Sequence, residues 1–206
     1  MNAAVFQREG EGFGSWVRDT CHAAFRCQNL LAPDEARESL SYISEHGFNN
    51  GVDCAAMPAI AAWDHYITTG DIQLLYEMLP GIIKYAEEAD ARYDEEMQLV
   101  HATMCLAQDA FEEPENGGYC LGTEIAFALM YQDVARICEV TGCYPERIKF
   151  WESRSKEMLA SIKEKYWNEE KECFTSGPIG SEAYEKGWWE DDWGRNGFVA
   201  TIWYCN

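Results

Sequence analysis

Apolar positions divide the chain into two alternating kinds of helical segment. The segments of the first kind are apolar over a wide arc and span residues 15–31, 53–68 and 121–141. The segments of the second kind carry one narrow apolar stripe and span residues 33–46, 71–91 and 145–166. A helix that is apolar nearly all round is buried, whereas a helix with one stripe covers a core from outside. The pattern therefore predicts inner and outer helices in alternation.

Short turns join each inner segment to the outer segment that follows it. Thr69-Gly-Asp71 and Thr141-Gly-Cys143 are two such turns, and Gly47 ends the segment that Pro33 begins. Two antiparallel helices joined by a short turn form an αα-hairpin. We therefore expect an all-α fold of stacked antiparallel αα-hairpins.

The chain length of 206 residues fits one domain with one sizeable core. We expect residues 1–206 to be an incomplete domain, because the apolar run 194–206 stops where a fourth inner helix begins. Two long connections, 92–120 and 167–193, each lead from an outer segment to the next inner one. Long loops gathered at one end of a compact helical fold often build a site, so we expect the functional residues there.

The charge of the chain disfavours several classes of partner. It carries 36 acidic and 16 basic residues, which gives a formal net charge of −20. Such a chain repels phosphate backbones and anionic lipid surfaces, so we expect neither a nucleic-acid nor a membrane partner. No stretch reaches the roughly 18 apolar residues of a membrane span, and no basic-then-apolar signal begins the chain. We expect a cytoplasmic protein, because the cysteines fit a reducing compartment better than a disulfide framework.

The cysteines and short motifs indicate neither a metal nor a cofactor. None of the nine cysteines forms a CxxC or Cys/His pair with zinc spacing, so we expect reduced cysteines that pack as small apolar residues. The chain has no Gly-rich phosphate loop, no GxSxG elbow and no convincing Ser/His/Asp order. Dehydrogenase, kinase and serine-hydrolase functions therefore lack support.

An Arg–Asp pair stands at the start of the first inner segment, in Gly14-Ser-Trp-Val-Arg-Asp-Thr20. Adjacent helical residues do not face each other, so Arg18 and Asp19 are not expected to form a simple intrahelical ion pair. Asp19 has two interpretations: it compensates the helix dipole, or it binds a ligand together with Arg18. A guanidinium and a carboxylate together satisfy sugar hydroxyls, and Trp16 offers an aromatic wall beside them.

A second candidate is Asp109, within Leu106-Ala-Gln-Asp-Ala-Phe-Glu-Glu-Pro114. Desolvation by apolar neighbours raises the pKa of a carboxyl group, which suits a general acid. The alternative is an ordinary turn or helix-capping aspartate.

Two further acidic positions accompany these residues. Glu124 lies in the first turn of the third inner segment, where its charge compensates the helix dipole or contacts a ligand. The run Trp188-Trp-Glu-Asp-Asp-Trp193 alternates indoles with carboxylates. Trp188 and Trp189 can pack on sugar faces while Glu190 and Asp191 accept hydroxyl protons, or the tryptophans can simply pin the loop.

Together these motifs resemble a family of helical-barrel glycosidases. Trp16-Val-Arg-Asp19 resembles the Trp-x-Arg-Asp element of glucoamylase-like enzymes and of the amylo-α-1,6-glucosidase domain of glycogen-debranching enzymes. Ala62-Trp-Asp-His-Tyr-Ile-Thr-Thr-Gly-Asp71 and the helix from Thr123 to Tyr131 are similar to other parts of that superfamily. The resemblance runs over most of residues 10–167. It implies part of a six-hairpin (α/α)6 toroid, with a little over three hairpins present.

The resemblance also implies roles for single residues. Arg18 and Asp19 would hold the hydroxyls of the sugar, Glu124 would line the same subsite, and Asp109 would be the acid that protonates the glycosidic oxygen. The chain departs from the pattern before the acid, where Ala107-Gln108 replaces the usual aromatic residue. The family's base lies beyond the last residue given. The implied reaction is inverting hydrolysis of an oligo- or polysaccharide by an exo-acting, α-glucosidase-like enzyme.

Two other functions remain open. A phosphorylase or a different glycosidase can use the same barrel. A helical-repeat scaffold without catalysis is the alternative from another class. A scaffold predicts a regular repeat and no long loops, whereas the connections here are unequal and carry aromatic and acidic residues.

Overall fold

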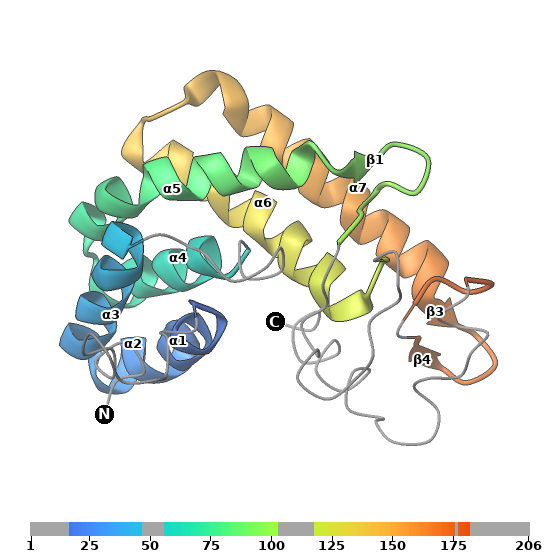
Figure 1. The fold of residues 1–206 in the computed structure, drawn as a ribbon, viewed down its shortest axis with the longest axis horizontal. Helices are drawn as coiled ribbons and strands as arrows, with labels where there is room; N and C mark the ends of the chain where they lie inside the picture. The colour runs from blue at the N-terminus through green and yellow to red at the C-terminus, as the bar shows by residue number, and fades with distance from the viewer. Residues whose placement is uncertain (1–16, 47–55, 103–117, 176, 182–206) are drawn as a thin grey trace.

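The computed structural model describes residues 17–46, 56–102, 118–175 and 177–181 (Figure 1). These residues form packed helices with two small antiparallel sheets of two strands each. The predicted all-α fold is therefore confirmed.

The first hairpin begins with one continuous helical stretch in three parts. These are α1 (Val17–Ala23), the π-helix η2 (Ala24–Gln28) and α2 (Asn29–Leu31), and the outer helix α3 (Pro33–His46) follows them. The sequence pattern did not indicate the π-helical turn. It also placed Leu30 and Leu31 on the buried arc, but both are exposed, because they lie at the end of the helix beside the turn into α3.

The second hairpin consists of α4 (Met57–Thr69) and α5 (Ile72–Asp90). Gly70 ends α4 in the left-handed conformation, with φ 77°, and its N–H donates to the carbonyl of Tyr66 at 2.7 Å. The carboxylate of Asp71 then accepts from the N–H of Leu74 and caps α5. A turn of two residues thus ends one helix and begins the next.

The third hairpin consists of α6 (Leu121–Thr141), a short 3-10 turn, η5 (Pro145–Arg147), and α7 (Ile148–Tyr166). The bounds of α6 agree with the sequence prediction. Gly142 ends α6 with φ 70°, the same left-handed conformation as Gly70.

A β-hairpin follows each of the last two outer helices. β1 (Tyr93–Asp94) pairs with β2 (Leu99–Val100) after α5, and β3 (Trp167–Asn168) pairs with β4 (Cys173–Phe174) after α7. The two hairpins share a sequence pattern of an aromatic residue, an Asx residue and two glutamates. Each also has a non-glycine residue at positive φ in the corresponding turn position, Gln98 or Glu172. The predicted long loops therefore begin with ordered hairpins.

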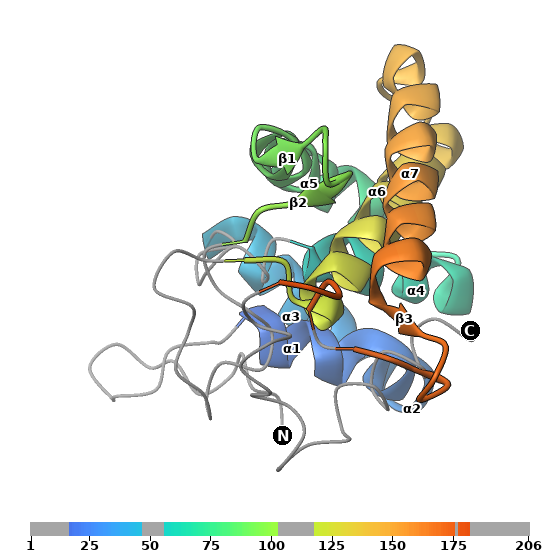
Figure 2. The same ribbon diagram turned by 90° about the vertical axis from the view of Figure 1, so that its right-hand side faces the viewer.

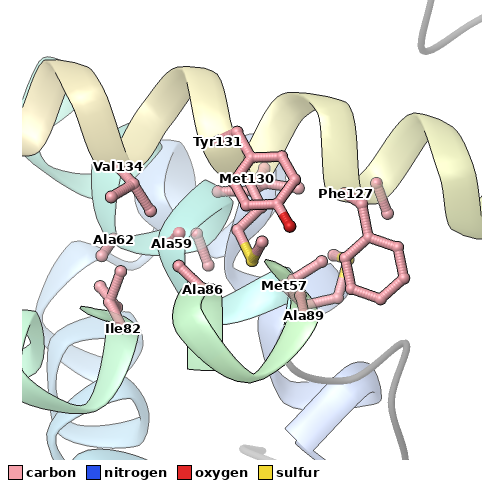
Figure 3. Packing of buried hydrophobic residues seen from close by; sticks show 14 of the residues in the cluster. Met57, Ala59, Ala62, Ile82, Ala86, Ala89, Phe127, Met130, Tyr131 and Val134 are labelled. Atoms are coloured by element: carbon pink, nitrogen blue, oxygen red, sulfur yellow. The ribbon is translucent and has the colours of Figure 1, made fainter. Parts of the chain in front are cut away.

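The helices form two layers, as predicted. The inner helices α1, α4 and α6 contact one another in series, and α3, α5 and α7 cover them from outside (Figures 1 and 2). Figure 3 shows α4, α5 and α6 meeting through small residues such as Ala59, Ala62 and Ala86, with Phe127 and Tyr131 filling the wider spaces. Small side chains let helices approach closely, so these alanines set the spacing between α4, α5 and α6.

Arg154 of α7 fixes the first β-hairpin to the helical layers. Its Nε lies 2.9 Å from Asp90 Oδ1, and one of its Nη atoms lies 3.3 Å from Glu95 Oε1. The guanidinium also covers the ring of Tyr93, 3.4 Å from the ring centroid. Because Arg154 is almost fully buried, these contacts tie α7, the end of α5 and β1 into one unit.

Candidate functional site

The residues predicted for the site are described only in part. Those outside the described residues are Trp16, Asp109, Trp188, Trp189, Glu190 and Asp191. The backbone of Asp19 belongs to α1, but its side chain is also outside the description. Arg18 and Glu124 are the two predicted site residues whose side chains the structure describes.

Arg18 and Glu124 occupy equivalent places in the inner layer. Arg18 lies in the first turn of α1 and Glu124 in the first turn of α6, and both side chains are buried. α6 begins on the side of the molecule where α5 and α7 end (Figure 1), and β2 contacts both α6 and α7. The start of α6 and the β-hairpins that follow α5 and α7 therefore lie on one side.

Glu124 is a fully buried carboxyl group. Its Oε2 accepts from the N–H of Val100 at 2.9 Å, while its Oε1 has no hydrogen-bond partner among the described residues. Burial raises the pKa of Glu124 well above its usual value, and the hydrogen bond from Val100 opposes this rise only in part. Burial thus favours the protonated form of this side chain, which can donate as well as accept a hydrogen bond.

A backbone bridge joins the two residues that flank the segment containing Asp109. Ala102 and Gly118, the residues on either side of residues 103–117, exchange two backbone hydrogen bonds of 3.1 and 2.8 Å. The N–H of His101 donates to the carbonyl of Arg92 at 3.0 Å and extends the β1–β2 pairing. The two ends of the segment are thus joined directly to the first β-hairpin.

A hydrogen bond between a tyrosine and an aspartate reinforces this backbone bridge. The Tyr119 hydroxyl donates to Asp94 Oδ2 at 2.7 Å, and the ring of His101 packs edge-on against Tyr119. The Tyr166 hydroxyl donates to the carbonyl of Tyr119 at 2.9 Å. The backbone N–H of Met97 and then the Tyr119 hydroxyl lower the pKa of Asp94, so this carboxylate stays ionised.

The pKa values of the two carboxyl groups beside this bridge are therefore shifted in opposite directions. The pKa of Asp94 is lowered by hydrogen bonds and that of Glu124 is raised by burial, and such opposite shifts separate acid and base roles. Sequence reasoning missed Asp94 and Tyr119. The repeat of the 93–100 pattern at 167–174 could have revealed the hairpin around Asp94, but the partnership with Tyr119 depends on tertiary contact.

A second buried polar cluster joins the first two helical hairpins, away from the bridge between Ala102 and Gly118. The amide of Asn29 donates to Asp64 Oδ2 at 2.8 Å, and its Oδ1 lies 2.9 Å from Nδ1 of His65, which therefore carries the proton. Burial lowers the pKa of His65 and keeps the ring neutral. These groups satisfy one another, so the cluster is structural.

Asp133 of α6 is a further buried acid. Burial raises its pKa to about 7, although Arg136, with a nitrogen 2.9 Å from Asp133 Oδ1, opposes the rise. The charge of Asp64 adds to this rise in the pKa of Asp133.

The described cysteines follow the sequence prediction only in part. Cys21 and Cys138 are buried, as expected, whereas Cys27 and Cys173 are exposed and Cys120 is disulfide-bonded.

The described part of the chain has neither a membrane-spanning helix nor a cluster of metal ligands. No helix in it combines the length and apolarity needed to cross a bilayer, and it contains no group of three or more side chains arranged to hold a metal ion.

Comparison with known proteins identifies the fold. No protein-family model matches the sequence, and no curated protein is significantly similar to it. The fold is similar to part of a GH78 family rhamnosidase of Bacillus sp. GL1, with a TM-score of 0.60 and 12% sequence identity. The alignment covers 78% of this chain and 18% of the rhamnosidase chain, so this chain spans less than a fifth of that protein. At such low identity the likeness concerns the fold, and the chain therefore has a helical, glycosidase-like fold.

Proposed function

We propose that the chain is a portion of the catalytic domain of a glycoside hydrolase that acts on an oligo- or polysaccharide. The observation that carries the proposal is the backbone bridge between Ala102 and Gly118, beside which two carboxyl groups have pKa values shifted in opposite directions. Burial raises the pKa of Glu124, and hydrogen bonds lower the pKa of Asp94. Acid–base cleavage of a glycosidic bond needs carboxyl groups held in different protonation states. The glycosidase-like fold supports the same class of reaction.

In this proposal Asp109 is the general acid. Arg18 and Asp19 hold hydroxyls of the sugar, with Trp16 beside them, and Trp188, Trp189, Glu190 and Asp191 form a second sugar-binding segment. Glu124 is buried and accepts a hydrogen bond from Val100. We therefore assign it the role of positioning the Ala102–Gly118 bridge beneath the sugar.

We further propose an inverting mechanism. An inverting enzyme places a second carboxylate about 6.5–9.5 Å from the acid, where it activates a water molecule. The proposed base lies outside residues 1–206, so activity is to be measured on the complete protein.

The assignment of Asp109 is tested by Asp109→Asn in the complete protein. We expect kcat to fall by about two to four orders of magnitude, because an amide cannot protonate the leaving oxygen. The unfolding midpoint is expected to stay at the wild-type value. Glu112→Gln, in the same segment, is the matched control and is expected to keep activity. Near-normal turnover of Asp109→Asn would show that another residue is the acid.

Substrate class is tested with two nitrophenyl glycosides. The resemblance in sequence motifs favours an α-glucoside, whereas the structural neighbour is named a rhamnosidase and favours a rhamnoside. The complete protein is expected to release nitrophenol from one of the two, and NMR of the first sugar product shows whether the anomeric configuration is inverted. Turnover of neither glycoside, with no binding of short oligosaccharides, would favour the non-catalytic scaffold.

A further inference from the structure

A third strand segment extends the first β-hairpin beside the Ala102–Gly118 bridge. On one side of this extension, the N–H of His101 donates to the carbonyl of Arg92 at 3.0 Å. On the other side, the bridge between Ala102 and Gly118 sets the register, so His101 lies opposite Tyr119. The side chains of opposite residues in an antiparallel pair project from one face. The rings of His101 and Tyr119 accordingly meet edge-on, with their centroids 5.4 Å apart.

Asp94 completes this cluster from the first strand of the hairpin. It pairs with Leu99 in the β1–β2 register, and Leu99 lies two residues before His101. Asp94 and His101 are therefore diagonal neighbours on one face of the strands. The Tyr119 hydroxyl donates to Asp94 Oδ2 at 2.7 Å. Asp94, His101 and Tyr119 thus lie within reach of one small molecule, and all three side chains are partly exposed.

The three side chains keep hydrogen-bonding capacity that the described residues do not use. Asp94 Oδ1 accepts from the N–H groups of Glu96 and Met97, both at 2.9 Å. Among the described residues Oδ2 accepts from Tyr119 alone, so it has room for a second donor, and the Tyr119 oxygen can still accept. Neither ring nitrogen of His101 has a hydrogen-bond partner in the described part of the chain, and a neutral imidazole offers one donor and one acceptor.

We propose that Asp94, His101 and Tyr119 form a carbohydrate-binding site, in which His101 hydrogen-bonds hydroxyl groups of the substrate. Sugar hydroxyls both donate and accept, and the cluster offers several acceptors together with an imidazole donor. His101 precedes residues 103–117 by two positions and Tyr119 follows them by two, so the site lies beside both ends of the segment that carries the proposed acid. This site rests on the proposed function, because it binds the same oligo- or polysaccharide.

Other classes of ligand fit the cluster less well. The carboxylate of Asp94 and the net charge of −20 disfavour a phosphate or another anion. The described part of the chain has no group of three or more His, Cys, Asp and Glu side chains placed to hold a metal ion. A wholly apolar ligand would leave the imidazole and the carboxylate without partners. A polyhydroxylated ligand therefore matches these three side chains best.

The site is tested by steady-state kinetics of His101→Ala in the complete protein, with an α-linked glucose trisaccharide and a rhamnose-terminated disaccharide as probes. For the probe that the wild type cleaves, we expect KM to rise about five- to tenfold, as for the loss of one or two hydrogen bonds to the substrate. We expect kcat to stay within about twofold of the wild-type value, because the proposed acid is unchanged.

His101→Gln separates binding from stability. Both variants lose the ring contact with Tyr119, so both are expected to melt lower by the same amount, no more than about 4 °C. The glutamine amide can donate and accept, so His101→Gln is expected to recover part of the wild-type KM, whereas a purely structural histidine predicts equal KM values for the two variants. Tyr144→Ala, which removes an exposed aromatic ring at the other end of α6, is the matched control and is expected to keep the wild-type KM.

Two results overturn the site while leaving the proposed function in place. One is a wild-type KM in His101→Ala, and the other is a KM in His101→Gln that is no better than in His101→Ala. A complete protein that neither cleaves nor binds either probe overturns the proposed function as well. The two failures are therefore distinguished by the behaviour of the wild type.

Discussion

Single buried side chains decide much of this protein's behaviour, and their environments could not be predicted from the sequence. Glu124 was recognised as a candidate because it stands in the first turn of an apolar helix. Its single bond to Val100 depends on a hairpin that was not predicted. The same is true of Asn29, which joins Asp64 and His65 across two hairpins. A periodic pattern shows which face of a helix is buried, but it does not show which polar groups meet there.

Asp133 makes stability depend on pH in a direction opposite to that of most carboxylates. Its pKa of about 7 in the folded state lies above the ordinary value of about 3.9, so the folded state binds more protons between these limits. The contribution of Asp133 is therefore fully present below about pH 4 and is lost as pH rises through about 7. Within that range the free energy of unfolding falls by up to about 1.4 kcal/mol per pH unit on account of this residue.

Asp133→Asn removes this titration. Urea unfolding between pH 4 and pH 8 is expected to show a smaller loss of stability with rising pH in Asp133→Asn than in the wild type. Asp34→Asn, at an exposed position in the first turn of α3, is the control and is expected to keep the wild-type slope. Equal slopes for Asp133→Asn and the wild type would contradict the prediction.

Secondary-structure elements were the most predictable level of this fold. α3 and α6 have the predicted bounds, because proline and glycine mark their ends and their apolar residues recur at helical spacing. The predicted start of the second inner segment, residue 53, lies outside the described residues, and α4 ends one residue later than predicted. The β-hairpins were missed because strands of two residues are too short to show an alternating pattern.

Gly142, which ends α6, allows the contribution of a helix end to stability to be tested. Gly142 has φ 70°, and a Cβ added there meets no atom within 4 Å, so substitution introduces backbone strain without a steric clash. Gly142→Ala is expected to lower the free energy of unfolding by about 1 kcal/mol. Gly142→Asn is expected to cost less, because asparagine tolerates the left-handed conformation. Equal effects of the two variants in urea unfolding would argue that conformation at Gly142 does not limit stability.

At the scale of the whole molecule, the net charge determines how the protein interacts at long range. The stacked hairpins are similar in fold to part of a rhamnosidase, and the chain carries a formal charge of −20. That this charge excludes nucleic-acid partners stays a prediction. The ion pairs of Arg154 and Arg37 are local, and acidic residues outnumber basic ones 36 to 16. Repulsion among carboxylates therefore outweighs attraction over the molecule as a whole.

This balance predicts that salt stabilises the protein. Raising ionic strength from about 0.01 M to about 0.15 M shortens the screening length from about 30 Å to about 8 Å and weakens the repulsion. The thermal unfolding midpoint at pH 7 is expected to rise by several degrees, equally in sodium and potassium chloride. A midpoint that falls over this range would mean that attractive ion pairs dominate.

The backbone bridge between Ala102 and Gly118 has a consequence for how such a protein can change over time. Because the two residues hold each other through paired hydrogen bonds, the chain between them enters and leaves the fold at one fixed point. The entropy of closing a loop grows only slowly with its length, so stretches of different size and composition can be exchanged there at little cost to the helices. Residues 103–117 can thus be replaced, in evolution or by loop grafting, to change what the protein binds while the helices stay the same.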